Sequence, residues 1–220
     1  MRKEAFVKWS GFALILWALQ MIARDYIFAF THGSSEYDNR LTLLGLSAGQ
    51  FAMLWTPFTL LGVLGLAGVY GQASPRLSTA GRAGFLVALL GLGMWFVAQV
   101  MVVWILDPVR YFRSPLVYGG WLLSLASIFV LTVGLVLAGI DIRKAHALPR
   151  GRSLILTIGI LLLPTVLIQG YLVANSDGFF ASKLLYGSLS VPYDLCWLWL
   201  GYLLVTATQG VSARAPDHDR

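Results

Sequence analysis

The chain has 220 residues, of which 58% are hydrophobic and only 12% are charged, against about 25% charged residues in an average soluble domain. A soluble fold of this size cannot bury so much apolar surface, so the composition excludes an ordinary water-soluble protein. The net charge of +6 comes from basic residues between the apolar runs rather than along one face, which argues against a nucleic-acid partner. The length fits a single integral membrane domain, residues 1–220.

Six stretches are long and apolar enough to cross a bilayer, which requires about 20 mostly apolar residues. In chain order they are 5–23, 50–71, 83–106, 116–140, 153–174 and 195–211. The last five contain no Asp, Glu, Lys or Arg, and none has the polar alternation of barrel strands. The sequence therefore predicts an all-α polytopic transmembrane bundle of about six helices, with short inner and longer outer connections.

The first stretch starts after Arg2 and Lys3 and is closed by Arg24 and Asp25, without a small-residue cleavage site. We therefore expect a retained first helix that also acts as the insertion signal. Residues 41–49 and 178–193 are apolar and aromatic outer segments, for which an interfacial or a re-entrant position is open.

Basic residues are distributed unequally between the two sides of the predicted bundle. Eleven fall on one side (Arg2, Lys3, Lys8, Arg76, Arg82, Arg143, Lys144, Arg150, Arg152, Arg214 and Arg220) and five on the other (Arg24, Arg40, Arg110, Arg113 and Lys183). Because the side richer in Lys and Arg stays in the cytoplasm, we expect both termini to be cytoplasmic, with the protein in the plasma membrane.

Small residues and prolines mark positions inside the spans. Glycines at 62, 65 and 68, and the set Gly84, Ala88 and Gly91, favour close helix packing, because small side chains let backbones approach in lipid. Pro57 and Pro164 each remove a helical hydrogen bond, so we expect helix kinks there. Packing is sufficient to explain these kinks, while a transport site at broken helices is the alternative.

Several chemistries are disfavoured by what the chain lacks. Cys196 is the sole cysteine, which rules out a disulfide within the chain, and the three histidines form no pair with metal-binding spacing. No span of the predicted set carries a carboxylate, His or Lys at its middle, which disfavours ion-coupled pumping. The sequence predicts no metal and no cofactor.

Three glutamines form a layer at similar depth in the predicted bundle. Gln20, Gln99 and Gln169 lie in the first, third and fifth helices, in the outer third of the bilayer. A buried amide requires partners, so these side chains favour either a shared polar cavity or hydrogen bonds that lock the bundle. Interfacial water near a helix end is the simpler explanation. With Arg110 and Arg113 at the rim, they are the candidate substrate-binding residues.

The outer segment 31–40 has the densest set of reactive side chains. His32 and Glu36 could serve as a base and its orienting acid, or ligate a divalent ion together with Asp38, and these three are the candidate catalytic residues. A solvated polar loop is the favoured explanation of this segment.

Three functional hypotheses follow. In the first, the protein binds or passes a neutral small molecule or lipid through an outward-facing polar cavity. In the second, it is an accessory or structural subunit of a larger membrane complex. In the third, it is an enzyme that acts on a lipid or headgroup at the outer surface, although the lack of a convergent acid–base pair makes this less favoured. Expected partners are membrane lipids and other membrane subunits or further copies of the chain.

Overall fold

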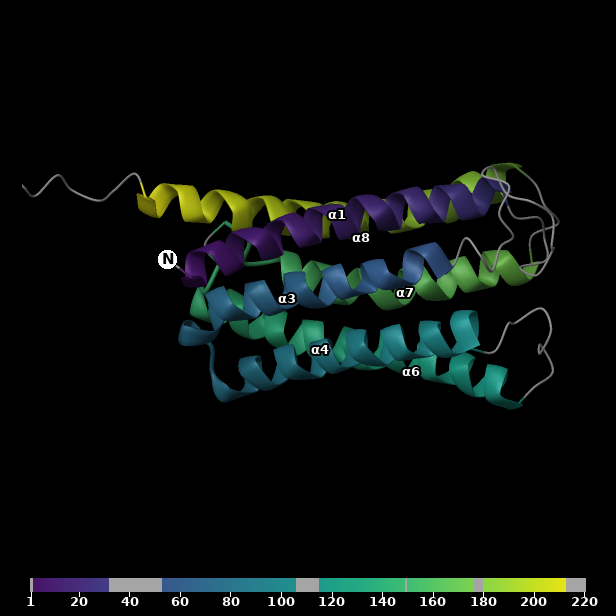
Figure 1. Ribbon diagram of the computed structural model, residues 1–220, viewed down its shortest axis with the longest axis horizontal. Helices are drawn as coiled ribbons and strands as arrows, with labels where there is room; N and C mark the ends of the chain where they lie inside the picture. The colour runs from purple at the N-terminus through teal and green to yellow at the C-terminus, as the bar shows by residue number, and fades with distance from the viewer. Residues whose placement is uncertain (1, 32–52, 106–114, 149, 176–179, 213–220) are drawn as a thin grey trace, which may run out of the picture.

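The computed structural model describes residues 2–31, 53–105, 115–148, 150–175 and 180–212 (Figure 1). Its elements are α1 (Arg2–Thr31), η1 (Thr56–Phe58), α3 (Thr59–Ala73), η2 (Ser74–Arg76), α4 (Thr79–Gln99), η3 (Val100–Ile105), α6 (Pro115–Ala145), α7 (Leu154–Asn175) and α8 (Phe180–Ser212). Within the described ranges there are no strands, and six helices are long and apolar enough to span a membrane. The predicted all-α transmembrane bundle is confirmed.

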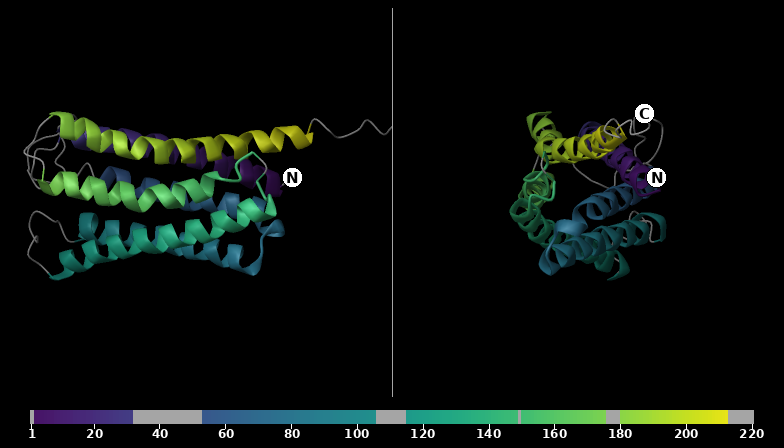
Figure 2. Two further views of the ribbon diagram at one scale, coloured as in Figure 1. Left: turned by 180° about the vertical axis from the view of Figure 1, so that it is seen from behind. Right: turned by 90° about the vertical axis from the view of Figure 1, so that its left-hand side faces the viewer.

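The spanning helices form a closed ring. Each long helix packs against the next one in the chain, and α8 closes the ring by packing along α1 (Figure 2). The start of α1 and the end of α8 lie at the same end of the bundle (Figure 1). We call this end the inner end and the opposite one the outer end, after the orientation that the basic residues predict.

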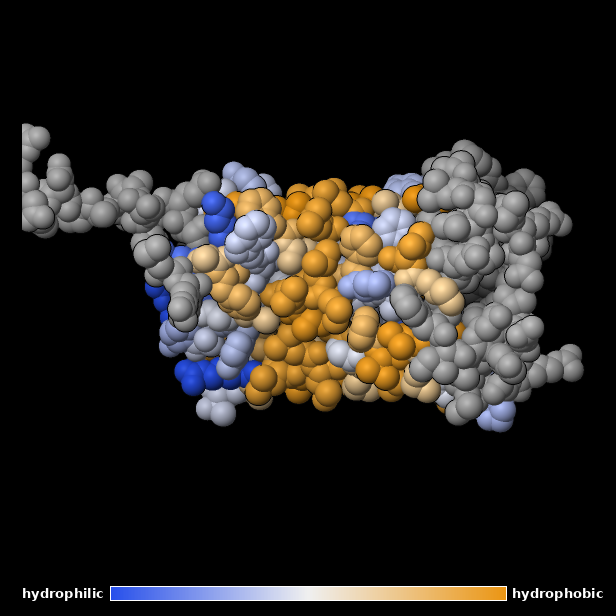
Figure 3. All heavy atoms as spheres, viewed as in Figure 1, coloured by the Kyte–Doolittle hydropathy of each residue, from blue (hydrophilic) through white to orange (hydrophobic). Residues whose placement is uncertain are grey.

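An apolar band crosses the middle of the bundle. On the face that Figure 3 shows, this band adjoins a more hydrophilic inner end. Large apolar side chains are exposed on outward helix faces, such as Leu16 of α1, Leu86 of α4 and Leu122 of α6. So much exposed apolar surface is what lipid contact requires.

Small residues bring the helices of this ring into close contact. On α3, Gly62, Gly65 and Gly68 lie against Trp17, Leu14 and Ser10 of α1. A Cβ atom added at Gly84 of α4 would lie 2.6 Å from the backbone nitrogen of Ala138 in α6. The predicted close packing through glycine faces is confirmed, and α6 is the partner of α4.

The last helix corrects the sequence prediction. We expected a span at 195–211, but α8 starts at Phe180 and its spanning part is Leu185–Thr206. Pro192 and Asp194 therefore lie inside a transmembrane helix, and the prediction that the last five spans carry no acidic residue is wrong. The physical reason is that Asp194 faces the protein interior, where its polarity costs no contact with lipid. The described α8 is one continuous helix, which excludes a re-entrant turn after Phe180.

The first helix is also longer than predicted. It continues beyond Arg24 and Asp25, and its candidate span is Glu4–Ile27. The carboxylate of Asp25 pairs with Arg24 at 2.8 Å, which offsets much of the cost of holding both charges inside the helix bundle.

At the inner end, Asp141 ties α6 to the start of α4. The Ser78 hydroxyl caps α4 by accepting from the Gly81 N–H at 3.3 Å. The same hydroxyl donates to Asp141 Oδ1 at 2.9 Å, and the Ser78 backbone N–H donates to Oδ2 at 2.8 Å. The carboxylate thus satisfies two donors at a helix N-terminus.

Replacing Asp141 with alanine is expected to lower the free energy of unfolding by about 1 kcal/mol, because two hydrogen bonds to a half-buried charged acceptor are lost. The thermal midpoint of the purified protein in detergent measures this. Lys144→Ala, an exposed change on the same helix, is the matched control. An equal decrease in both variants would contradict the assigned role of Asp141.

Candidate functional site

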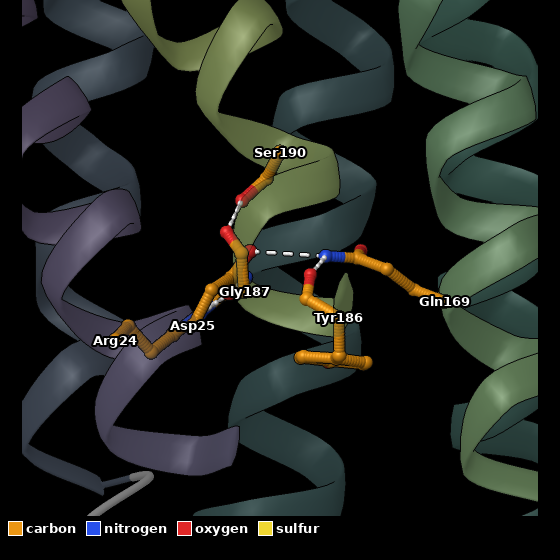
Figure 4. A network of polar contacts seen from close by, with 6 residues as sticks. All are labelled: Arg24, Asp25, Gln169, Tyr186, Gly187 and Ser190. Atoms are coloured by element: carbon orange, nitrogen blue, oxygen red, sulfur yellow. Dashed lines mark hydrogen bonds and ion pairs between the residues drawn. The ribbon is translucent and has the colours of Figure 1, made fainter. Parts of the chain in front are cut away.

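A polar network joins three helices near the outer end of the bundle. Asp25 of α1 is 2% exposed and accepts from the Nε and Nη2 atoms of Arg24 at 3.0 and 2.8 Å. Its other oxygen, Oδ2, accepts from the Gln169 amide of α7 at 3.3 Å. The same amide nitrogen donates to the backbone carbonyl of Tyr186 in α8 at 3.0 Å (Figure 4). The network thus ties α1, α7 and α8 together through side chains.

Arg24 extends this network to a fourth helix. Its guanidinium carbon lies 5.9 Å from the ring centroid of Trp95 in α4, which is a cation–π contact. This contact joins α1 to α4, which are separated by α3 in the ring. Polar contacts therefore run from α4 through α1 to α7 and α8.

A buried carboxylate lies further along α8. Asp194 is 0% exposed, near the middle of the span Leu185–Thr206. Among the described residues, neither of its carboxylate oxygens has a hydrogen-bond partner. Ser190, one turn nearer the outer end and 3% exposed, donates its hydroxyl to the Gly187 carbonyl at 3.4 Å (Figure 4). Asp194 is thus a buried acid whose acceptors are unused, an unusual arrangement inside a membrane protein.

Two tryptophans lie on the inner side of Asp194. Trp197 follows one turn later on α8, and its ring centroid is 5.0 Å from that of Trp17 in a T-shaped pair. Their exposed fractions are 0% and 1%, and neither indole N–H has a hydrogen-bond partner in the described structure. Tyr193 packs edge-on against Trp197 at 6.3 Å. On the inner side of this aromatic cluster, Leu14 of α1 and Leu200 and Leu204 of α8 are buried.

The candidate site is therefore a stripe of side chains in the bundle interior. Its side chains are polar toward the outer end, and its inner side is formed by Tyr193, Trp17 and Trp197, which we call the aromatic floor. The stripe comprises Arg24, Asp25, Gln169, Ser190, Asp194, Tyr193, Trp17 and Trp197. No model of a known protein family matches the chain, and neither a curated protein nor a solved structure is significantly similar to it. Function must therefore be inferred from the chemistry of this stripe.

The three glutamines predicted to share a site are placed differently. Gln169 belongs to the network with Asp25. Gln20 lies on α1 and is 7% exposed, and Gln99 is the last residue of α4 and is half-buried. No hydrogen bond joins these amides to one another in the described part of the chain. Gln169 is thus placed in the polar stripe, while a shared role for all three stays a prediction.

Other predicted residues divide into two groups. Pro57 lies in the short 3-10 helix η1 and Pro164 lies inside α7. The candidate catalytic residues His32, Glu36 and Asp38, the arginines Arg110 and Arg113, and the segment 41–49 lie outside the described residues. Within the described ranges, no group of three His, Cys, Asp or Glu side chains is placed to hold a metal ion.

The sequence did contain a signal for the residues that we missed. Ser190, Asp194 and Trp197 are spaced by four and three residues, which places them on one face of a helix. Extending the sixth helix toward the N-terminus through Pro192 would have revealed this face. The sequence analysis instead placed residues 178–193 in an outer segment and started the sixth span at residue 195, directly after Asp194.

Proposed function

We propose that the protein binds or passes a small polar molecule through the interior of the helix ring, with access from the outer side of the membrane. The observation that carries this proposal is the stripe of polar side chains that leads from the Asp25–Gln169 network to the unpartnered carboxylate of Asp194. Buried polar groups in a membrane are costly, so those without a structural partner are candidates for ligand contact.

The aromatic pair supports an outward-facing site rather than an open channel. Trp17 and Trp197 close the stripe on its inner side, and the side chains that follow, Leu14, Leu200 and Leu204, are at most 1% exposed. A molecule that enters from the outer end would therefore meet polar partners first and then an aromatic floor. A helix with an internal proline, such as α8 at Pro192, has one backbone bond fewer to restrain movement of this region.

The sequence predicted a neutral ligand for a cavity lined by glutamine amides, and Asp194 adds an ionisable group to the interior. The accessory-subunit and outer-surface enzyme hypotheses have no described contact in their favour, and the candidate catalytic residues of the latter lie outside the described part of the chain.

Cysteine accessibility tests the proposed site and its direction together. In a Cys196→Ala background, we expect Ser190→Cys to react with membrane-impermeant methanethiosulfonates added outside intact cells. Both the trimethylammonium-ethyl and the sulfonatoethyl reagent are used, and reaction with either supports access. Ser190 is 3% exposed, so its reaction requires the interior to open to water on the outer side.

Two further variants serve as controls. Leu204→Cys lies on the inner side of the tryptophan pair and is expected to resist both reagents, because Leu204 is 1% exposed in an apolar interface. Arg150→Cys, exposed at the inner end, is expected to react only after the cells are permeabilised. An unreactive Ser190→Cys, or one that reacts only from the side that labels Arg150→Cys, would overturn the proposed function.

A further inference from the structure

We propose that Asp194 is the counter-ion for a small organic cation of the ammonium class, held against Trp17, Tyr193 and Trp197 inside the helix ring. This inference rests on the proposed function and names the class of molecule that the interior site takes.

The first argument is charge balance in the interior of the bundle. The charged groups that act on Asp194 are Arg24 and Asp25. Arg24 is bonded to Asp25 through two nitrogen atoms, at 2.8 and 3.0 Å, so one positive and one negative charge already compensate each other. Asp194 adds a second carboxylate, and no described cation pairs with it. A buried acid without a paired cation is favoured in its neutral form. A cationic ligand would supply the missing positive charge and stabilise the Asp194 carboxylate, with the proton released to water as the ligand binds.

The second argument is the kind of surface beside this carboxylate. Tyr193 is its neighbour in the chain, Trp197 follows one turn later, and Trp17 packs on Trp197 at 5.0 Å. Aromatic rings attract organic ammonium groups through their negative faces, and such cages bind quaternary ammonium ions. A metal ion would require several oxygen or nitrogen ligands, and the described residues offer no group of three ligating side chains. The chemistry thus favours an organic cation.

The third argument concerns the indole N–H groups. Trp17 and Trp197 each have a buried Nε1 donor without a partner in the described structure. An oxygen atom on the ligand, or a water molecule carried with it, would satisfy these donors. A compact ammonium ion that bears a hydroxyl group therefore matches both the charge of the Asp194 carboxylate and the unused donors of the two indoles.

Choline and its uncharged carbon isostere, 3,3-dimethylbutan-1-ol, are probes that match in shape and hydroxyl group and differ in charge. We expect radiolabelled choline to bind the full-length protein in lipid nanodiscs at equilibrium. We expect the isostere to compete at least about tenfold less well than unlabelled choline, because it cannot pair with the carboxylate. Equal competition by the two compounds, or no saturable binding of choline, would overturn the assignment of a cation.

Variants assign the effect to one carboxylate. Asp194→Asn keeps the shape of the side chain but not its charge, and it should weaken choline binding at least about tenfold while leaving the weak competition by the isostere unchanged. Asp194→Glu should retain binding. Glu4→Gln, which removes an exposed carboxylate at the start of α1, is the matched control and should bind choline as the wild type does. Unchanged binding in Asp194→Asn would contradict the proposal, and if that variant does not fold, discrimination between the two probes by the wild-type protein decides alone.

Failure of this inference is distinguishable from failure of the proposed function. If Ser190→Cys reacts from outside and both probes compete equally, the interior site exists and its ligand is not selected by charge. If Ser190→Cys is unreactive from outside, the outward-facing site itself is wrong.

Discussion

Replacing Asp25 with alanine should lower the free energy of unfolding by about 3 kcal/mol, because an ion pair inside the bundle is broken from one side. The change leaves Arg24 without its carboxylate and Gln169 without one of its two acceptors. The value lies at the lower end of the range for buried pairs because the Arg24 side chain keeps 31% of its surface exposed. Reversible unfolding in mixed detergent micelles, or the thermal midpoint, measures the loss.

A paired variant separates loss of the ion pair from loss of packing. Arg24→Leu combined with Asp25→Leu removes both charges together, and it should be more stable than Asp25→Ala because no unpaired charge stays buried. Glu4→Ala, at an exposed carboxylate on the same helix, should leave stability unchanged. If Asp25→Ala behaved like Glu4→Ala, the network would not stabilise the outer end of the bundle.

Gly91→Ala should destabilise the protein by about 3 kcal/mol, at the upper end of what overpacking costs. A Cβ atom at Gly91 would lie 2.5 Å from the backbone nitrogen of Leu131 and 2.7 Å from its Cα atom. Backbone atoms cannot rotate away as a flexible side chain can, so α4 and α6 would have to separate. The thermal midpoint in detergent checks this result.

Gly93→Ala is the matched control, because it makes the same change two residues later on the same helix. A Cβ atom at Gly93 meets nothing within 4 Å, and Gly93 lines an open apolar groove with Leu90 and Val97. Alanine favours the helix over glycine by up to about 1 kcal/mol, so this variant should be unchanged or slightly more stable. Equal destabilisation by the two variants would mean that backbone contact at Gly91 is not what limits the packing.

Much of the fold was predictable, because one physical requirement dominates in lipid. A chain that crosses the membrane must satisfy its backbone hydrogen bonds internally, so long apolar runs become helices. The faces of Gly62 on α3 and Gly84 on α4 were recognisable as contact surfaces because small side chains let helix backbones approach closely in lipid. The candidate site was predicted only in part: Gln169 was expected to be a buried amide that requires partners, and its partners Asp25 and Tyr186 were not identified.

The sequence by itself determined that this protein is a bundle of apolar helices with tight glycine contacts, because hydropathy and residue size act locally along the chain. Only the tertiary structure decided that α8 closes the ring against α1, that Gln169 bonds to Asp25, and that Asp194 is buried in a span. The reason is that average hydropathy does not distinguish a side chain that faces lipid from one that faces other helices. A carboxylate is excluded from a helix face that contacts lipid and permitted on a face that contacts other helices. Only the packing of neighbouring helices shows which face carries it.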